Sequence, residues 1–219
     1  MPSSKVDIAN MVLEKLGQTV TITALSENTK HAKAINRAWD RVRDFVFADH
    51  PWLFATKVQA AAVSPDPVAA GWTYLYAYPA DCVNFIAITG ADGVRAIRRV
   101  PSMDDYSNHN PPIRDGRTDF EVLWAPQGTA IASDVEGAWI RYVAAIEDTA
   151  RWTPKFIEAF ANRMAWDRAG AIAGELGLQM RGALMQDYLY AKYDAGVQDG
   201  NEQRDNDTEV MTPTLVARR

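Results

Sequence analysis

Apolar residues near the N-terminus recur every three or four positions, the spacing that places them on one face of a helix. This helix is expected over residues 5–16. Ser3 or Ser4 precedes it as a candidate N-cap, and Gly17 follows it where a left-handed C-cap belongs. Its apolar face consists of Ile8, Met11, Val12 and Leu16.

A longer stretch with the same period predicts a second helix that begins after Ser26 and ends before Pro51. The proline sets the end, because the residue before a proline is pushed out of the helical region. Residues 19–23, rich in threonine, predict a short extended segment between the two helices. The apolar face of the second helix consists of Ala32, Ile35, Trp39, Val42, Phe45 and Val46.

The period changes over residues 53–146, where short apolar and aromatic runs alternate with turn residues. Residues 101–118 are rich in Pro, Asn, Asp and Gly and predict a long loop. The runs at residues 120–124, 129–132 and 138–144 predict a closing antiparallel meander. The zone as a whole predicts a small sandwich or barrel. The expected strands cover residues 53–63, 72–78, 83–89, 94–100, 120–124, 129–132 and 138–144.

Helical spacing returns after Thr153 and Pro154, which suit the N-cap and first helical positions. Gly174 and Gly177 are expected to break this stretch into two helices. From residue 198 the composition becomes almost wholly polar, which predicts a disordered tail.

These patterns together predict the α+β class. We expect a helical bundle from the N- and C-terminal helices, an inserted antiparallel β-sheet domain and an extended C-terminal tail. The corresponding segments are residues 1–52, 53–146, 147–197 and 198–219.

Composition narrows the function classes. Net charge is -5 over 219 residues, which argues against a tight, nonspecific nucleic-acid binder. The single cysteine, Cys82, excludes an internal disulfide and suits a reducing cytoplasm. No apolar run is long enough for a membrane span, so no membrane partner is expected.

The sequence contains no P-loop, nucleophile elbow or zinc-binding spacing, so we expect no catalytic site, no metal and no cofactor. His50 follows Asp49, which could orient it as a base. The same sequence also suits a histidine that is stabilised by the dipole at a helix C-terminus. Cys82 lies beside an apolar run and is expected to be a small buried side chain.

Two further segments are candidates for partner contacts. Arg95, Arg98 and Arg99 form the densest basic cluster, which suits either an acidic partner or a solvated edge strand. The polar tail is expected to become ordered only against another chain, with apolar anchors and a basic end. Those tail residues are Val210, Met211, Leu215, Val216, Arg218 and Arg219.

One segment is more specific. The pairs Leu16-Gly17, Trp39-Asp40 and Arg43-Asp44 are followed by His50, Pro51, Trp52, Leu53, Phe54 and Ala55. This pattern resembles the head-to-tail adaptor proteins of tailed bacteriophages, called tail tubular protein A in short-tailed phages. The stretch 78–82 also resembles that family's Tyr-x-x-Pro-x-Asp-Cys signature. His50, Pro51, Trp52, Phe54, Trp39 and Asp40 form a packing motif in this resemblance, not an active site.

The resemblance implies a structural protein of the virion neck, made in the host bacterial cytoplasm. Its expected partners are further copies of itself in a ring, usually of twelve, the portal protein, and the next tail nozzle or tail tube protein. Genomic DNA would pass through the ring during ejection. Two alternatives remain open at this point: a phage hydrolase that uses a carboxylate pair, and a tail module that binds a receptor.

Overall fold

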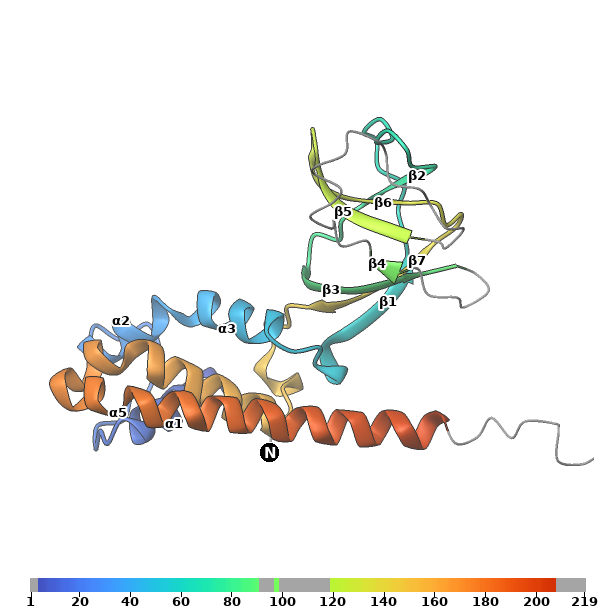
Figure 1. Cartoon of the computed structure of the whole chain (residues 1–219). Helices are drawn as coiled ribbons and strands as arrows, with labels where there is room; N and C mark the ends of the chain where they lie inside the picture. Colours follow the sequence, from blue (N-terminus) through green and yellow to red (C-terminus); the bar gives the residue numbers. More distant parts are fainter. Residues whose placement is uncertain (1–3, 91–96, 99–118, 208–219) are drawn as a thin grey trace, which may run out of the picture. The chain divides into compact units, whose positions relative to one another are not determined.

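The computed structural model describes residues 4–90, 97–98 and 119–207 (Figure 1). It contains both helices and antiparallel sheet, so the α+β class is confirmed. The chain divides into two compact units. We call Met1–Phe54 with Ile146–Arg219 the helical unit and Ala55–Ala145 the sheet unit.

Helix α1 (Lys5–Lys15) begins and ends where the sequence indicates. The Ser4 hydroxyl accepts a hydrogen bond from the Asp7 amide, and the Asp7 carboxylate accepts one from the Ser4 amide. This reciprocal cap satisfies N–H groups that have no partner within the helix. Gly17 has a φ of 67°, the left-handed conformation that glycine tolerates best.

The predicted second helix is two helices, α2 (Lys30–Asn36) and α3 (Trp39–Ala48). The expected Ser26 cap was wrong, because the Thr29 hydroxyl accepts from the Ala32 amide and starts α2. Residues 19–23 also form no strand. No proline or glycine marks the turn between α2 and α3, so the apolar period runs through it unbroken.

Helix α5 (Pro154–Asp207) contains the predicted break at Gly174, whose φ of 60° and ψ of -134° are not helical. Contacts across the break, such as the Lys155–Asp194 ion pair, show that the two halves run antiparallel to each other. Gly177 does not end a helix. A Cβ at this position would lie 2.1 Å from the carbonyl oxygen of Ala169, so glycine permits the close approach of the two halves.

The second half of α5 continues to Asp207, so a disordered tail beginning at residue 198 was wrong. Extending an existing helix adds one hydrogen bond per residue without a new nucleation step, and a polar sequence can therefore remain helical. The rest of the predicted tail, residues 208–219, lies outside the described residues.

Helices α1, α2 and α3 all pack against α5. The interior of the helical unit is an aromatic cluster with ring centroids 4.3–6.5 Å apart. Two short 3-10 turns, Leu53–Ala55 and Thr149–Arg151, lie where the chain leaves and re-enters this unit. The aromatic cluster consists of Trp39, Phe47, Trp52, Phe54, Trp152, Phe156 and Phe160.

The sheet unit contains two sheets. One has the order β1-β7-β3 and is antiparallel throughout. The other has the order β2-β6-β5-β4, in which the short β4 pairs in parallel with β5. The strands are β1 (Thr56–Ala60), β2 (Tyr74–Ala77), β3 (Cys82–Thr89), β4 (Ile97–Arg98), β5 (Asp119–Ala125), β6 (Gly128–Ser133) and β7 (Trp139–Ala144).

The predicted closing meander was therefore only partly right. Strands β5 and β6 form a hairpin, but β7 joins the other sheet, between β1 and β3. The segment between β6 and β7 contributes Val135 and Ala138 to the core, so the chain crosses from one sheet to the other there. That core takes Tyr76 and Ile131 from one sheet and Ile140 from the other, which makes the unit a small sandwich.

We predict that Trp52→Ala lowers the free energy of unfolding by about 3–5 kcal/mol, because the side chain is 1% exposed and fills the aromatic cluster. Trp124→Ala is the matched control, since Trp124 is 81% exposed, and should change stability by less than about 0.5 kcal/mol. Chemical denaturation followed by far-ultraviolet circular dichroism measures both. Equal effects at the two positions would contradict the core role of Trp52.

Candidate functional site

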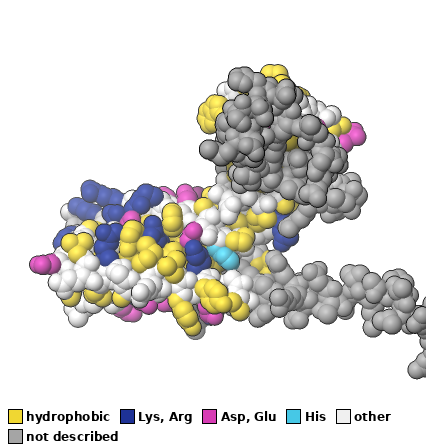
Figure 2. Space-filling view, in the orientation of Figure 1, with side chains coloured by type: hydrophobic (Ala, Val, Ile, Leu, Met, Phe, Trp, Pro, Cys, Tyr) yellow, Lys and Arg dark blue, Asp and Glu magenta, His cyan; other side chains and the backbone are white. Residues whose placement is uncertain are grey.

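A groove of about 400 Å³ runs along the second half of α5 and is lined mainly by apolar atoms. Leu189, Tyr193 and Val197 recur at intervals of four residues and form one strip of the helix, which we call the α5 stripe. Tyr193 is 71% exposed, and the other two are close to half exposed. Hydrophobic side chains are visible at the surface of the helical unit in Figure 2. An exposed apolar strip of this kind is a candidate surface for contact with another molecule.

His50, the first residue of the His50-Pro51-Trp52 motif, forms part of the wall of this groove. The His50 ring meets the Trp52 ring edge-on, with centroids 4.8 Å apart. On its other side His50 lies against Gly196, where a Cβ would be 3.0 Å from Cε1 of the imidazole. Trp52 itself is buried, so the motif joins the core of the helical unit to its surface.

Asp49 attaches the end of α3 to the second half of α5. Its carboxylate accepts a 2.5 Å hydrogen bond from the Tyr188 hydroxyl and a 2.7 Å bond from the Lys192 ammonium. Burial alone would raise the pKa of Asp49, but the hydrogen bonds from Lys192 and Tyr188 outweigh it and hold the pKa below its ordinary value. Burial and the Asp49 contact raise the pKa of Tyr188, so this hydroxyl remains a donor.

A basic surface lies beside these contacts. The Arg163 guanidinium stacks on Phe45 and Trp166, 4.1 and 4.2 Å from the ring centroids, and Arg181 stacks on Trp166 at 4.2 Å. Figure 2 shows Lys and Arg side chains gathered over one end of the helical unit. Stacked guanidinium groups are held in fixed positions and remain charged, so this surface suits an acidic partner.

The candidate nucleophile, Cys82, belongs to the sheet unit, and the candidate base, His50, belongs to the helical unit. Cys82 is half-buried in the sheet unit, where burial raises the pKa of its thiol and weakens it as a nucleophile. The neighbouring Asp81 binds Lys57 at 2.5 Å and Tyr142 at 2.9 Å. Burial and the bond to Asp81 raise the pKa of Tyr142 to about 12. Across the described ranges, no group of three or more His, Cys, Asp or Glu side chains could hold a metal ion.

The residues of the predicted packing motif are split between core and surface. Trp39 and Trp52 are buried in the aromatic cluster, and Phe54 lies at its edge, half-buried. Asp40 is exposed and binds Arg43 at 2.9 Å, while Pro51 is exposed at the turn after α3.

The predicted partner residues are largely untested. Arg98 belongs to β4, and its side chain is not described. The others, Arg95, Arg99, Val210, Met211, Leu215, Val216, Arg218 and Arg219, lie outside the described residues.

Sequence reasoning missed the α5 stripe. The residues that face inward from the second half of α5 include Leu184, Tyr188 and Ala191. Leu189 and Tyr193 are exposed and lie on another face of the same helix. A helix that carries apolar residues on a second face, in addition to the face that packs on its own core, indicates such a surface.

Neither a scan against models of known protein families nor a search of curated proteins gives a match. Among the described helices, none is both long enough and apolar enough to cross a membrane.

We predict that Asp49→Asn destabilises the helical unit at neutral pH and that the loss shrinks in acid. A carboxyl whose pKa is lowered on folding stabilises the fold above its unfolded pKa, and this contribution disappears as pH falls through the folded value. Unfolding free energies of both proteins at several pH values measure the difference. Tyr188→Phe removes one donor to Asp49. In a Tyr188→Phe background, Asp49→Asn should therefore lower the free energy of unfolding by less than it does in wild type. A gap between wild type and Asp49→Asn that is constant with pH would contradict this account.

Proposed function

We propose that the chain is a structural head-to-tail adaptor of a tailed bacteriophage, one subunit of a ring between the portal and the tail. The observation that carries the proposal is the α5 stripe, an apolar strip exposed to solvent on a helix that is otherwise fixed to its unit. The resemblance of the segment from Leu16 to Ala55 supplies the identity of the assembly.

The chemistry of the stripe suits contact between proteins. Tyrosine and leucine together give a large apolar area, and tyrosine also retains a hydroxyl for a partner at the rim. The stripe lies on a helix fixed by Asp49, Tyr188 and Lys192, so little ordering is required when a partner binds.

A ring requires that each subunit present two different surfaces, one to each neighbour. We propose the α5 stripe as one of these two surfaces. In this proposal genomic DNA passes through the opening of the ring, and the basic surface around Arg163 and Arg181 contacts an acidic surface of another protein.

The contacts of α1, α2 and α3 with α5 support a helical bundle built from both ends of the chain. The sheet unit is then an insertion available to the portal or to the next tail protein. The arginines at 95, 98 and 99 and residues 208–219 remain proposed partner contacts. The hydrolase and receptor-binding alternatives gain no specific support from the described residues.

We predict that the double variant Leu189→Asp, Tyr193→Asp abolishes ring formation and leaves the melting temperature nearly unchanged. The two side chains are 48% and 71% exposed, so the charges disrupt a contact between subunits more than the fold. Val20→Asp is the matched control, because Val20 is 50% exposed and lies outside the stripe.

Native mass spectrometry and negative-stain microscopy of the three purified proteins measure the outcome. We expect closed rings for wild type and Val20→Asp and monomers for the double variant. Wild-type protein that stays monomeric at every soluble concentration, or a double variant that forms normal rings, would count against the proposal.

A further inference from the structure

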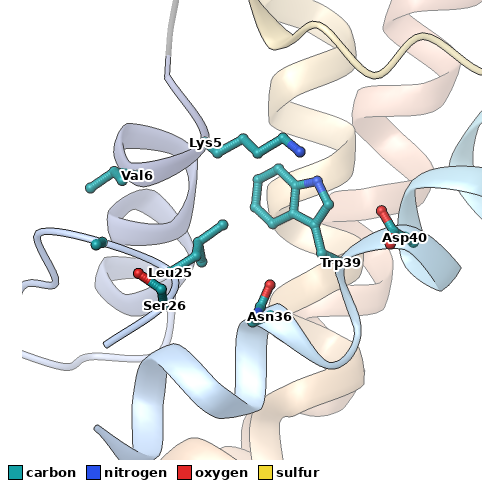
Figure 3. A pocket seen from close by; sticks show the side chains of 8 residues that line it. Lys5, Val6, Leu25, Ser26, Asn36, Trp39 and Asp40 are labelled. Atoms are coloured by element: carbon teal, nitrogen blue, oxygen red, sulfur yellow. The ribbon is translucent and has the colours of Figure 1, made fainter. Parts of the chain in front are cut away.

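A second hollow in the helical unit, of about 460 Å³, lies where the start of α1 faces the turn between α2 and α3 (Figure 3). Val6 and Leu25 give it apolar walls, and the Trp39 indole extends between them and Asp40. Lys5 reaches over the indole, with its ammonium 5.9 Å from the ring centroid. The hollow therefore combines an aromatic surface with a cation at its rim.

Two hydrogen-bond donors at this rim have no acceptor among the described residues. Trp39 is 2% exposed, and its Nε1–H is buried without a hydrogen-bond partner there. Figure 3 shows the indole nitrogen on the side of the ring that faces the Lys5 ammonium. The described part of the chain also gives that ammonium no ion-pair partner.

The other buried indoles of the aromatic cluster make the contrast clear. Trp52 donates its N–H to the Val46 carbonyl at 2.7 Å, and Trp152 donates to the Ile146 carbonyl at 2.9 Å. A buried donor without an acceptor destabilises the fold, so an acceptor at Trp39 would recover free energy. A single oxygen-bearing group placed between Trp39 and Lys5 would satisfy both donors.

The charges around the hollow select the kind of acceptor. Lys5 favours an anion, whereas Asp40 lies at the same rim and repels a doubly charged one. Arg43 partly offsets the Asp40 charge through its 2.9 Å contact. The apolar walls provide space for a short aliphatic stem. A carboxylate on such a stem fits these conditions better than phosphate does.

We propose that this hollow binds a carboxylate carried on a short aliphatic stem, as in a glutamate side chain. The Lys5 ammonium and the Trp39 Nε1–H donate to its oxygens, and the stem packs on the indole face. Lys5 is exposed and long, so it can move aside to admit the group. The proposal is independent of ring formation, because all of its residues belong to one copy of the helical unit.

The test uses the full chain and follows indole N–H signals by nuclear magnetic resonance, with the Trp39 signal assigned from Trp39→Phe. The probes are the peptide acetyl-Gly-Glu-Gly-amide, the neutral match with Gln in place of Glu, free butyrate and inorganic phosphate. Lys5→Gln removes the cation from an exposed position, and Lys30→Gln is the control, an exposed lysine that does not line the hollow.

We expect the Glu peptide and butyrate to shift the Trp39 signal of wild type and of Lys30→Gln. Lys5→Gln should weaken this binding about tenfold or more, since a charged hydrogen-bond partner is lost. Tighter binding of the peptide than of butyrate would assign the carboxylate to a partner chain, and the reverse would assign it to a small molecule. A response to the Gln peptide equal to that of the Glu peptide, tighter phosphate binding, an unmoved Trp39 signal or unchanged binding by Lys5→Gln would each overturn the proposal.

Discussion

The aromatic cluster of the helical unit, held by two indole hydrogen bonds, is the constraint on which the rest of that unit depends. Trp52 and Trp152 each donate to the carbonyl six residues earlier, at 2.7 and 2.9 Å. These two residues lie where the chain leaves and re-enters the helical unit. Both indole rings contact the ring of Phe156 on α5, with centroids 4.9 Å apart for Trp52 and 4.8 Å apart for Trp152. The entry, the exit and the longest helix are thus fixed by one set of contacts, which explains why the His-Pro-Trp motif is structural.

The surfaces follow from the same arrangement. Because Trp52 is buried, His50, two residues earlier, lies at the groove along α5, where it packs against Gly196. Asp49 then binds Tyr188 and Lys192, which sets the rotation of the second half of α5. That rotation directs Tyr188 inward and leaves Tyr193 exposed. The α5 stripe is therefore a consequence of how the motif after α3 is packed.

Local signals in the sequence predicted much of the fold. Ser4, Gly17 and Gly174 each specify a backbone conformation by their own chemistry, and the structure confirms all three. The errors arise where distant contacts decide. The turn between α2 and α3 carries no breaking residue, and the partners of β7 depend on a crossing between sheets that no local pattern encodes.

The surfaces were harder to predict than the core, for a physical reason. An apolar residue on a helix has the same periodicity whether it faces its own core or a partner, so Tyr193 becomes recognisable only once Tyr188 is known to be buried. The unsatisfied N–H of Trp39 is likewise invisible in the sequence. Its two counterparts, Trp52 and Trp152, are satisfied by carbonyls that only the folded chain brings within reach.

The central claim is that this chain is a ring subunit of a virion neck. The most direct measurement is a cryo-electron microscopy map of the neck of particles produced by the genome that encodes it, together with mass spectrometry of the same purified particles. We predict a closed ring of this chain between the portal and the next tail protein, with the α5 stripe buried against a neighbouring subunit. Particles that are infectious and lack the chain, or a neck whose ring is built from another protein, would contradict the account.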